Sequence, residues 1–479
     1  MNRNSLLKSG FWITYGAIAT RILALFSNLI LARLLLPEAF GVIAVAYIFW
    51  AFVNLFTQGT AGDFLVYKGL EDERYVNTTY TISIIIGLVL ALGMVAISPL
   101  AASFFAVPSL VWILAIFAVN FLLSSIHAVY VGVLKRRMQY RAIANTYLIA
   151  SLIRVLATTG CALAGLSFWS FAIGDSAYWI GICILTRRYV KMKFRFQIDS
   201  QAKAEVLSFC LGATGSSLGF YVNSNCDNFV IGRLLGSTSL GYYNFAYQLT
   251  MALNTILAQI MSQLGMSVFA QLENDKQQEK ALLNVVEQIA FLAAPVFSLF
   301  FLVIDEQAIT LIFKEKWIPA TPVIPWLLVF AYFRLINNAL FNMLSAKGKP
   351  GVNARMNLQI APIAVLSFII GAWEGGIVGV SIAVAITLGI FGTIYGWWIG
   401  CREMKWPLFK FLVPTIVPAL IALPAIFLSL QLGEMWQPFV FVLLYLVFVR
   451  LAIPRQFANY QSLSMRALKK LSEKLKRSQ

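Results

Sequence analysis

Three arginines stand near the middle of long apolar runs: Arg21, Arg154 and Arg334 each lie about ten or more residues from either end of the run. If the runs are helices, a rise of 1.5 Å per residue places these side chains ~15 Å from either end. An arginine at that depth in hydrocarbon costs at least ~2.5 to 3.5 kcal/mol, so it should face a protein interior or a wet cavity. Its planar fork suits phosphate oxygens and stays charged. The three residues therefore predict a cavity for an anionic substrate, a phosphate or diphosphate rather than a lone carboxylate.

A structural salt bridge is the alternative explanation for each of these arginines. The acidic candidates for partners lie nearer the ends of their runs and are Asp63, Asp175, Asp227 and Glu287. We therefore expect the central arginines to be short of carboxylates and at least two of them to line the cavity. The three aspartates are instead candidates for coupling to H⁺ or Na⁺.

The segment "YVNSNCDN", from Tyr221 to Asn228, is the most polar piece within any of the apolar runs. Asn223 and Asn225 in this segment could bind a sugar or a cation. Amide side chains inside an apolar helix can also hydrogen-bond neighbouring helices. Both interpretations stay open.

The composition indicates what surrounds these residues. Of the 479 residues 60% are hydrophobic and 12% are charged, and the mean hydropathy is +0.78. An average soluble domain has ~25% charged residues. Because apolar runs of ~20 residues, enough to cross a ~30 Å hydrocarbon core as a helix, recur along the whole length, we predict an all-α polytopic membrane protein.

We expect about fourteen transmembrane helices, in two sets of six and a final pair. The spans of the first set are 11–33, 41–66, 79–104, 109–130, 143–165 and 167–187. Those of the second set are 205–231, 240–269, 283–304, 321–345, 356–373 and 376–400, and the pair covers 408–430 and 435–453.

The net charge of +17 could indicate nucleic-acid binding, but the positions of the charges argue against it. With the N-terminus in the cytoplasm, 30 of the 37 Lys and Arg residues lie in or beside cytoplasmic loops. The seven others are Arg21, Arg33, Arg154, Arg233, Lys314, Lys316 and Arg334. This asymmetry follows the positive-inside rule. It predicts cytoplasmic N- and C-termini, with the segment from Asp305 to Lys316 outside, and no nucleic-acid partner.

Signatures of catalysis and of metal binding are missing from the sequence. The five cysteines, at positions 161, 183, 210, 226 and 401, show no CxxC or Cys/His spacing, and the single His127 suits packing better than ligation. No Walker A motif, nucleophile elbow, HExxH or Gly-rich dinucleotide turn occurs. We expect no enzyme activity, no metal and no cofactor.

A short stretch of the chain occurs twice, 200 residues apart. Aligning 28–47 with 228–247 without gaps gives seven identities, at Asn28, Arg33, Leu34, Leu35, Gly41, Ala46 and Tyr47, where composition alone gives roughly one or two. Six membrane crossings return the chain to the side on which it started, so two six-helix lobes would be related by an axis along the membrane normal. Arg33 and Arg233 would then lie at the same end of their lobes. A helix, turn and helix common to any bundle is the alternative.

The repeat and the charges together predict the organisation of the chain. We expect an N-lobe at 1–190, a basic cytoplasmic linker at 191–204, a C-lobe at 205–402, helices 13 and 14 at 403–453, and a basic amphipathic tail at 454–479. The tail should lie on the anionic inner leaflet, so membrane lipids are expected partners.

Several segments resemble those of one transporter family. "ARLLLPEAFGVIAVAY" from Ala32, "DNFVIGRLLGSTSLGYYNFAYQL" from Asp227, "KEKWIPA" from Lys314 and "LSAKGKP" from Leu344 occur in an order and spacing similar to the polysaccharide transporters, the Wzx-type exporters of the multidrug/oligosaccharidyl-lipid/polysaccharide flippase superfamily. The resemblance covers nearly the whole chain. One departure is Gln58, where many relatives carry an Asp, so no family role passes to Asp63.

The resemblance implies a fourteen-helix, two-lobe protein of the bacterial inner membrane. Such a protein moves undecaprenyl-diphosphate-linked oligosaccharide from the cytoplasmic to the periplasmic leaflet by alternating access, and a cation-rich cavity receives the diphosphate and sugars. Polysaccharide polymerase machinery is a further candidate partner. The alternatives are a polytopic polymerase or ligase, which usually needs a large catalytic outer loop, and a small-molecule antiporter of the same fold, which would need a smaller, less cationic cavity.

Overall fold

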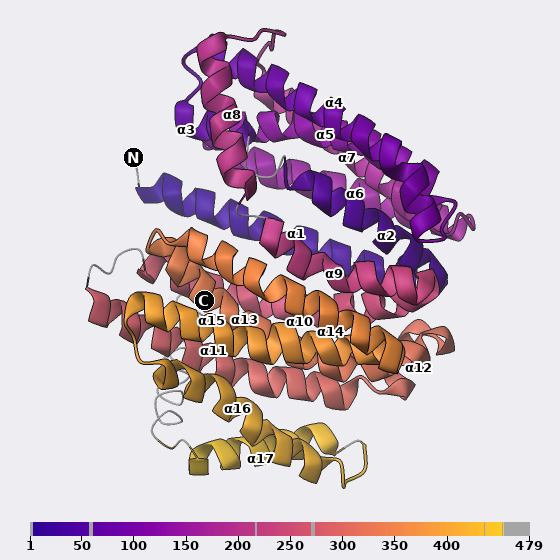
Figure 1. Ribbon diagram of the computed structural model, residues 1–479, viewed down its shortest axis with the longest axis vertical. Coiled ribbons are helices and arrows are strands. Elements are labelled where there is room, and N and C mark those ends of the chain that lie inside the picture. Colours follow the sequence, from indigo (N-terminus) through magenta and orange to yellow (C-terminus); the bar gives the residue numbers. More distant parts are fainter. Residues whose placement is uncertain are drawn as a thin grey trace, which may run out of the picture. The chain divides into compact units, whose positions relative to one another are not determined.

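The computed structural model describes residues 3–56, 61–215, 218–269, 274–434, 436–452 and 454. Within these ranges all regular structure is helical and no strand occurs (Figure 1). Nine helices in the described ranges are long and apolar enough to cross a membrane. The prediction of an all-α, multi-pass membrane protein is therefore confirmed.

The chain divides into two compact units, each of which is described by itself. The first comprises Met1–Gln248, Thr310–Val323 and Asn357–Ala383, and the second comprises Leu249–Ile309, Ile324–Met356 and Val384–Gln479. Both units draw on both halves of the sequence, and the six-helix lobes and the linker boundaries stay predictions.

The first unit contains most of the N-terminal helices. They are α1 (Arg3–Leu34), α2 (Pro37–Asn54), α3 (Ala61–Lys68), α4 (Glu73–Phe104), α5 (Leu110–Arg136), α6 (Tyr140–Leu163), α7 (Trp169–Val190), α8 (Ser200–Gly215) and α9 (Leu218–Leu234), together with the first part of α10 (Gly236–Phe269), the 3₁₀ helix η1 (Glu315–Val323) and most of α14 (Pro350–Val384).

The second unit contains the remaining helices. They are the larger part of α10, α11 (Asp275–Val303), the first half of α12 (Glu306–Phe313), α13 (Ile324–Ala346), the first residues of α14, the π-helical η2 (Ala385–Phe391), α15 (Gly392–Met404), α16 (Leu408–Ser429) and α17 (Gln437–Ala452). In it α11 packs on α13 and α16, and α16 packs on α17.

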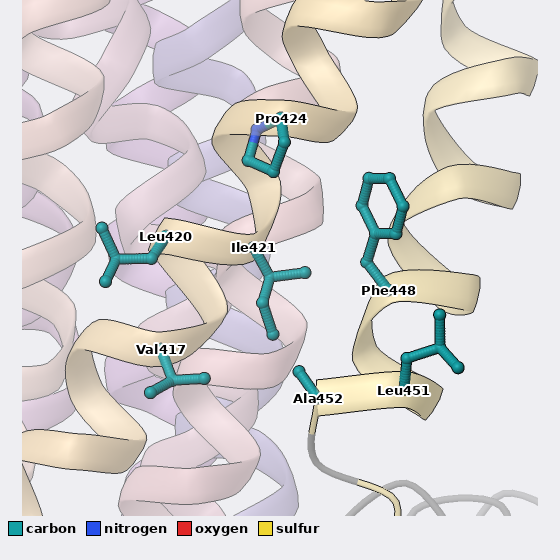
Figure 2. A pocket seen from close by; sticks show the side chains of 7 residues that line it. All are labelled: Val417, Leu420, Ile421, Pro424, Phe448, Leu451 and Ala452. Atoms are coloured by element: carbon teal, nitrogen blue, oxygen red, sulfur yellow. The ribbon is translucent and has the colours of Figure 1, made fainter.

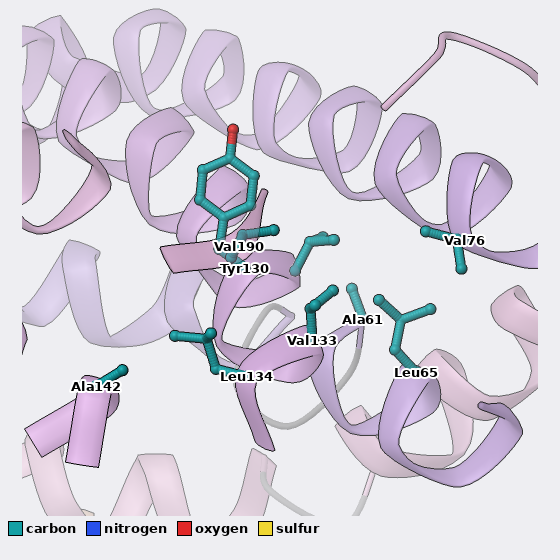
Figure 3. Packing of buried hydrophobic residues seen from close by; sticks show 9 residues of the cluster. Ala61, Leu65, Val76, Tyr130, Val133, Leu134, Ala142 and Val190 are labelled. Carbon is teal, nitrogen blue, oxygen red and sulfur yellow. The ribbon is translucent and has the colours of Figure 1, made fainter. Parts of the chain in front are cut away.

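The helices α4, α5, α6 and α7 run side by side in the first unit, and α1 packs on α6 (Figure 1). One core cluster at an end of this bundle joins α3 to α7 (Figure 3). Its members are Ala61, Leu65, Val76, Val129, Tyr130, Val133, Leu134, Ala142 and Val190. Since burying a Val or Leu side chain contributes ~1.5 to 3 kcal/mol, this cluster holds the short helix α3 against α5.

The basic segment after α7 is held along α4 by polar side chains. Asn77 Oδ1 accepts the backbone N–H of Arg195 at 3.0 Å, and Thr81 Oγ1 accepts that of Gln197 at 3.1 Å. Thr78 Oγ1 accepts the N–H of Asp199 at 3.0 Å. Alternate backbone N–H groups of this segment thus find acceptors on one face of α4.

The repeated stretch forms the same helix, turn and helix twice. The first helices end at Leu34 and Leu234, and Leu35 N–H and Leu235 N–H each donate to the carbonyl four residues before, at 2.8 Å. The two turns use different chemistry. In the first copy Pro37 restricts the residue before it and starts α2, and in the second Gly236 adopts a φ of +86°.

Two predicted spans differ from single helices. The span 41–66 contains α2 and α3, because α2 stops at Asn54 and a turn follows it. The span 205–231 covers parts of α8 and α9. The predicted boundary between 356–373 and 376–400 is confirmed, since Gly375 and Gly376 leave helical geometry. The tail from Phe457 lies outside the described residues.

Candidate functional site

A ring of three polar side chains lies inside the first unit. Arg154 Nε on α6 lies 2.6 Å from Asp175 Oδ1 on α7. Tyr47 on α2 closes the ring, because its hydroxyl accepts a hydrogen bond from Arg154 Nη2 at 3.0 Å and donates one to Asp175 Oδ2 at 2.6 Å. We call Tyr47, Arg154 and Asp175 the Arg154 triad. It joins three helices with one side chain from each.

Close packing of α6 on α7 brings the triad together. A Cβ on Gly174 would lie 2.0 Å from Thr158 Oγ1, so only glycine permits this approach. Thr158 is one turn beyond Arg154 on α6, and its hydroxyl donates to the Arg154 carbonyl at 2.6 Å. Asp175 follows Gly174 on α7, at the level where the two helices are close enough for its carboxylate to reach the guanidinium.

The triad leaves part of the arginine unused. Arg154 has five N–H donors, and within the part of the chain that the structure describes two of them have partners, one in Asp175 and one in Tyr47. The Arg154 side chain is 37% exposed, whereas that of Asp175 is 12% exposed. An ion-paired cation thus keeps hydrogen-bonding capacity beyond its two recorded partners.

The expectation that the central arginines lack carboxylates was wrong for Arg154. Counted from the end that α6 and α7 share, Arg154 lies nine residues inside α6 and Asp175 six residues inside α7. At 1.5 Å per residue the difference in depth is only about 4.5 Å, which a long arginine side chain spans. Arg154 is therefore an ion-paired residue, and its role in a cavity stays a prediction.

The two other arginines have different surroundings. Arg21 on α1 is exposed, and the described residues provide it with no recorded hydrogen bond or ion pair. Arg334 on α13 belongs to the second unit, is half-buried, and places its guanidinium carbon 5.5 Å from the centroid of the Phe330 ring. Substrate binding by Arg21 and Arg334 stays a prediction.

The two asparagines of α9 lie in the first unit and are partly buried. Asn223 donates to the backbone carbonyl of Asn357 at 2.8 Å and to its side-chain Oδ1 at 3.0 Å. Asn225 donates to the carbonyl of Tyr221, one turn earlier. Asn223 thus joins α9 to α14, as amide groups between apolar helices commonly do, and its predicted role in substrate binding is untested.

The aspartates proposed for ion coupling all have partners. Asp63 lies 3.0 Å from Lys135 Nζ with both side chains partly exposed. Asp227 is 3% exposed and accepts a hydrogen bond from Tyr243 at 2.7 Å. Asp175 belongs to the Arg154 triad. Their predicted role in coupling also stays untested.

The end of α1 is covered by residues almost 300 positions away in the sequence. Lys316 Nζ donates to the carbonyls of Arg33 and Leu35 at 3.0 and 2.6 Å, and the buried Trp317 Nε1 donates to that of Ala32 at 2.7 Å. These bonds satisfy carbonyls that a helix end leaves unpaired. Two segments singled out in the sequence, "ARLLLPEAFG" and "KEKWIPA", thus form one contact.

The repeat pair Arg33 and Arg233 is exposed at both helix ends. Arg233 places its guanidinium carbon 4.8 Å from the centroid of the Phe104 ring. Sequence reasoning had missed Tyr47 as a polar partner, although its identity with Tyr247 set it apart. No pattern had indicated the bond from Trp317 to Ala32.

An apolar groove lies between α16 and α17 in the second unit (Figure 2). Its volume is about 460 Å³, and its lining is Val417, Leu420, Ile421, Pro424, Phe448, Leu451 and Ala452. Since none of these side chains can hydrogen-bond, the groove suits a hydrocarbon chain.

Known proteins are similar to this chain over most of its length. The chain is 22% identical to the lipopolysaccharide biosynthesis protein WzxC of Escherichia coli (strain K12), with 88% of this chain and 86% of WzxC aligned. It is 24% identical to the succinoglycan biosynthesis transport protein ExoT of Rhizobium meliloti (strain 1021), covering 90% and 88% of the two chains.

A solved structure has the same fold. The inward closed conformation of the lipid II flippase MurJ matches with a TM-score of 0.73 at 17% identity, over 92% of this chain and 98% of that one. The family model described as "Polysaccharide biosynthesis protein" matches residues 30–322. The resemblance stated from the four sequence segments is thereby confirmed, and the chain belongs to this polysaccharide biosynthesis protein family of membrane proteins.

Proposed function

We propose that the chain moves undecaprenyl-diphosphate-linked oligosaccharide repeat units from the cytoplasmic to the periplasmic leaflet of the bacterial inner membrane, for synthesis of O-antigen or exopolysaccharide. Relatives named for polysaccharide biosynthesis and transport support this proposal. So does the fold shared with a lipid II flippase.

Arg154 is the observation that carries the proposal. A permanently charged guanidinium far from both ends of an apolar helix is costly to insert, and the ion pair with Asp175 offsets part of that cost. Its ion pair with Asp175 uses only part of its donors, and phosphate oxygens match the remainder. The apolar groove between α16 and α17 separately suits a polyprenyl chain.

Transport by alternating access would require two lobes and a defined orientation. Lobes at 1–190 and 205–402, cytoplasmic termini and an external Asp305–Lys316 segment meet that requirement. Coupling could use H⁺, Na⁺ or the membrane potential acting on a charged substrate. Asp63 and Asp227 are the candidates that remain once Asp175 serves as the counter-ion of Arg154.

Deletion of the gene in the native host tests the proposal. Lipid-linked sugars of the cytoplasmic leaflet of the deletion strain are analysed by mass spectrometry, beside the parent and a strain carrying a plasmid copy. Complete lipid-linked repeat units should accumulate, because assembly on the cytoplasmic leaflet continues while export stops. A polymerase or ligase would instead let repeat units reach the periplasm, and an antiporter of small molecules would leave their amount unchanged.

A further inference from the structure

We infer that Tyr47 and Asp175 position Arg154 as a fork for a diphosphate, holding one edge of the guanidinium so that the other edge is presented to the substrate. This inference rests on the proposed function and names the group of the substrate that the site takes. It assigns a role to Tyr47 and makes Asp175 a positioning residue rather than a coupling one.

The geometry of the guanidinium carries the inference. Nε–H and one N–H of Nη2 lie on the same edge, and these are the donors used by Asp175 Oδ1 and by the Tyr47 hydroxyl. The hydroxyl then donates to Asp175 Oδ2, so one edge is bound by a closed ring of three bonds. The second edge, formed by Nη1 and Nη2, has no recorded partner among the residues that the structure describes.

The free edge has the shape that phosphate needs. Two parallel N–H groups of one guanidinium can bind two oxygens of one phosphate, which a lysine ammonium cannot do. The Arg154 side chain is 37% exposed and that of Asp175 12%, so the carboxylate is the more enclosed member of the pair.

The neighbouring packing fixes the ring in place. Tyr47 packs on the Phe117 ring of α5 at 5.5 Å between centroids, and Gly174 lets α7 approach Thr158 of α6. A guanidinium already held in its binding pose loses less conformational freedom when the ligand arrives. Asp175 also neutralises the cation when no substrate is bound.

Three variants of the full chain test these roles. Tyr47→Phe removes the hydroxyl without changing a charge, and Arg154→Lys keeps the charge but removes the fork. The double variant Arg154→Gln/Asp175→Asn removes both charges, which leaves no unpaired buried ion. Tyr147→Phe on α6 is the matched control, because its hydroxyl has no recorded hydrogen bond within the described ranges and its ring keeps the contact with His127.

Binding is measured on the purified protein in nanodiscs, with farnesyl diphosphate and farnesyl monophosphate as probes. The wild type and Tyr147→Phe should prefer the diphosphate. Tyr47→Phe should weaken diphosphate binding about threefold to tenfold, and Arg154→Lys and the double variant should abolish the preference. Nanodiscs containing phosphatidylglycerol repeat each measurement, and the preference should persist there if lipid phosphates do not occupy the site.

Abundance and melting temperature separate positioning from a structural ion pair. If the triad only stabilises the fold, the double variant should be as abundant as the wild type and should bind both probes as the wild type does. That result, or a wild-type preference in Tyr47→Phe or Arg154→Lys, would overturn the inference. If the preference for the diphosphate disappears in nanodiscs that contain phosphatidylglycerol, the inference is overturned as well, since the site would then be a lipid headgroup site.

The same variants in the deletion strain distinguish this failure from failure of the proposed function. If the deletion accumulates lipid-linked sugar and the variants bind the probes and restore export like the wild type, only the inference fails. If the deletion accumulates none, the proposed function fails and the inference fails with it.

Discussion

Gly41 and Gly241, which are 200 residues apart in the two copies of the repeat, lie face to face. A Cβ on Gly41 would come 1.7 Å from the carbonyl oxygen of Ser237, and one on Gly241 would come 1.9 Å from that of Pro37. Pro37 and Ser237 are themselves 200 residues apart, so the contact is reciprocal. This reciprocity is what a local twofold axis between the two copies of the turn produces.

Gly41→Ala and Gly241→Ala should each destabilise the protein. The added methyl group meets a backbone oxygen that cannot rotate away, and such overpacking costs about 1 to 3 kcal/mol or more. Thermal denaturation followed by size-exclusion chromatography should show a lower melting temperature for both variants. Gly93→Ala on α4 is the control, because its Cβ would meet no atom within 4 Å. Wild-type melting of Gly41→Ala would contradict the reciprocal contact.

Trp317→Phe should weaken the cap on the end of α1. The indole N–H donates to the Ala32 carbonyl at 2.7 Å from a side chain that is 0% exposed. Leaving a buried acceptor unpaired costs about 1 to 3 kcal/mol. The melting temperature of this variant is compared with that of Trp326→Phe, whose side chain is 38% exposed. Equal effects of the two changes would argue that the bond to Ala32 contributes nothing specific.

Thr78→Val with Thr81→Val should release the basic segment after α7. The hydroxyls of these threonines accept the backbone N–H groups of Asp199 and Gln197, and valine has the same shape without an acceptor. Lys191, Lys193 and Arg195 make the released segment a substrate for trypsin. Limited proteolysis of the purified double variant should therefore cut there faster than in the wild type.

The control for that experiment is Thr79→Val on the same helix. The Thr79 hydroxyl is buried and has no hydrogen-bond partner among the described residues, so its loss should not affect the segment. Equal rates of cleavage in the double variant and in Thr79→Val would show that the threonine hydroxyls do not hold the segment.

The charge asymmetry of the loops gives a topology that labelling can check. Cysteine placed at Gln307 should react with an impermeant maleimide in intact cells, because the segment from Asp305 to Lys316 is expected outside. Cysteine at Lys193 should react only after lysis. The parent chain, with its five native cysteines, gives the background. Labelling of position 193 in intact cells would reverse the proposed orientation.

The sequence allowed the helices to be predicted, because each span depends on local hydropathy. The turn at Gly375 and Gly376 and the paired ends at Leu34 and Leu234 agree with the structure for that reason. The break after Asn54 was missed, since apolar residues continue on both sides of it.

The partner of Arg154 could not be predicted from local hydropathy. Depth counted along one helix says nothing of the offset between neighbours, and it is the contact of Gly174 with Thr158 that brings α7 close to α6. The bond between Trp317 and Ala32 joins residues 285 positions apart, and a single sequence contains no signal for such a pairing.

The most direct test of transport uses proteoliposomes that contain the lipid-linked sugar isolated from the deletion strain. Impermeant periodate oxidises only the sugar on the outer leaflet, and the fraction oxidised is followed with and without an imposed membrane potential. Wild-type protein should make the inner pool accessible, whereas Arg154→Gln/Asp175→Asn at equal abundance should leave most of it protected. If the inner pool stays protected with the wild type under every imposed gradient, the chain does not move this lipid.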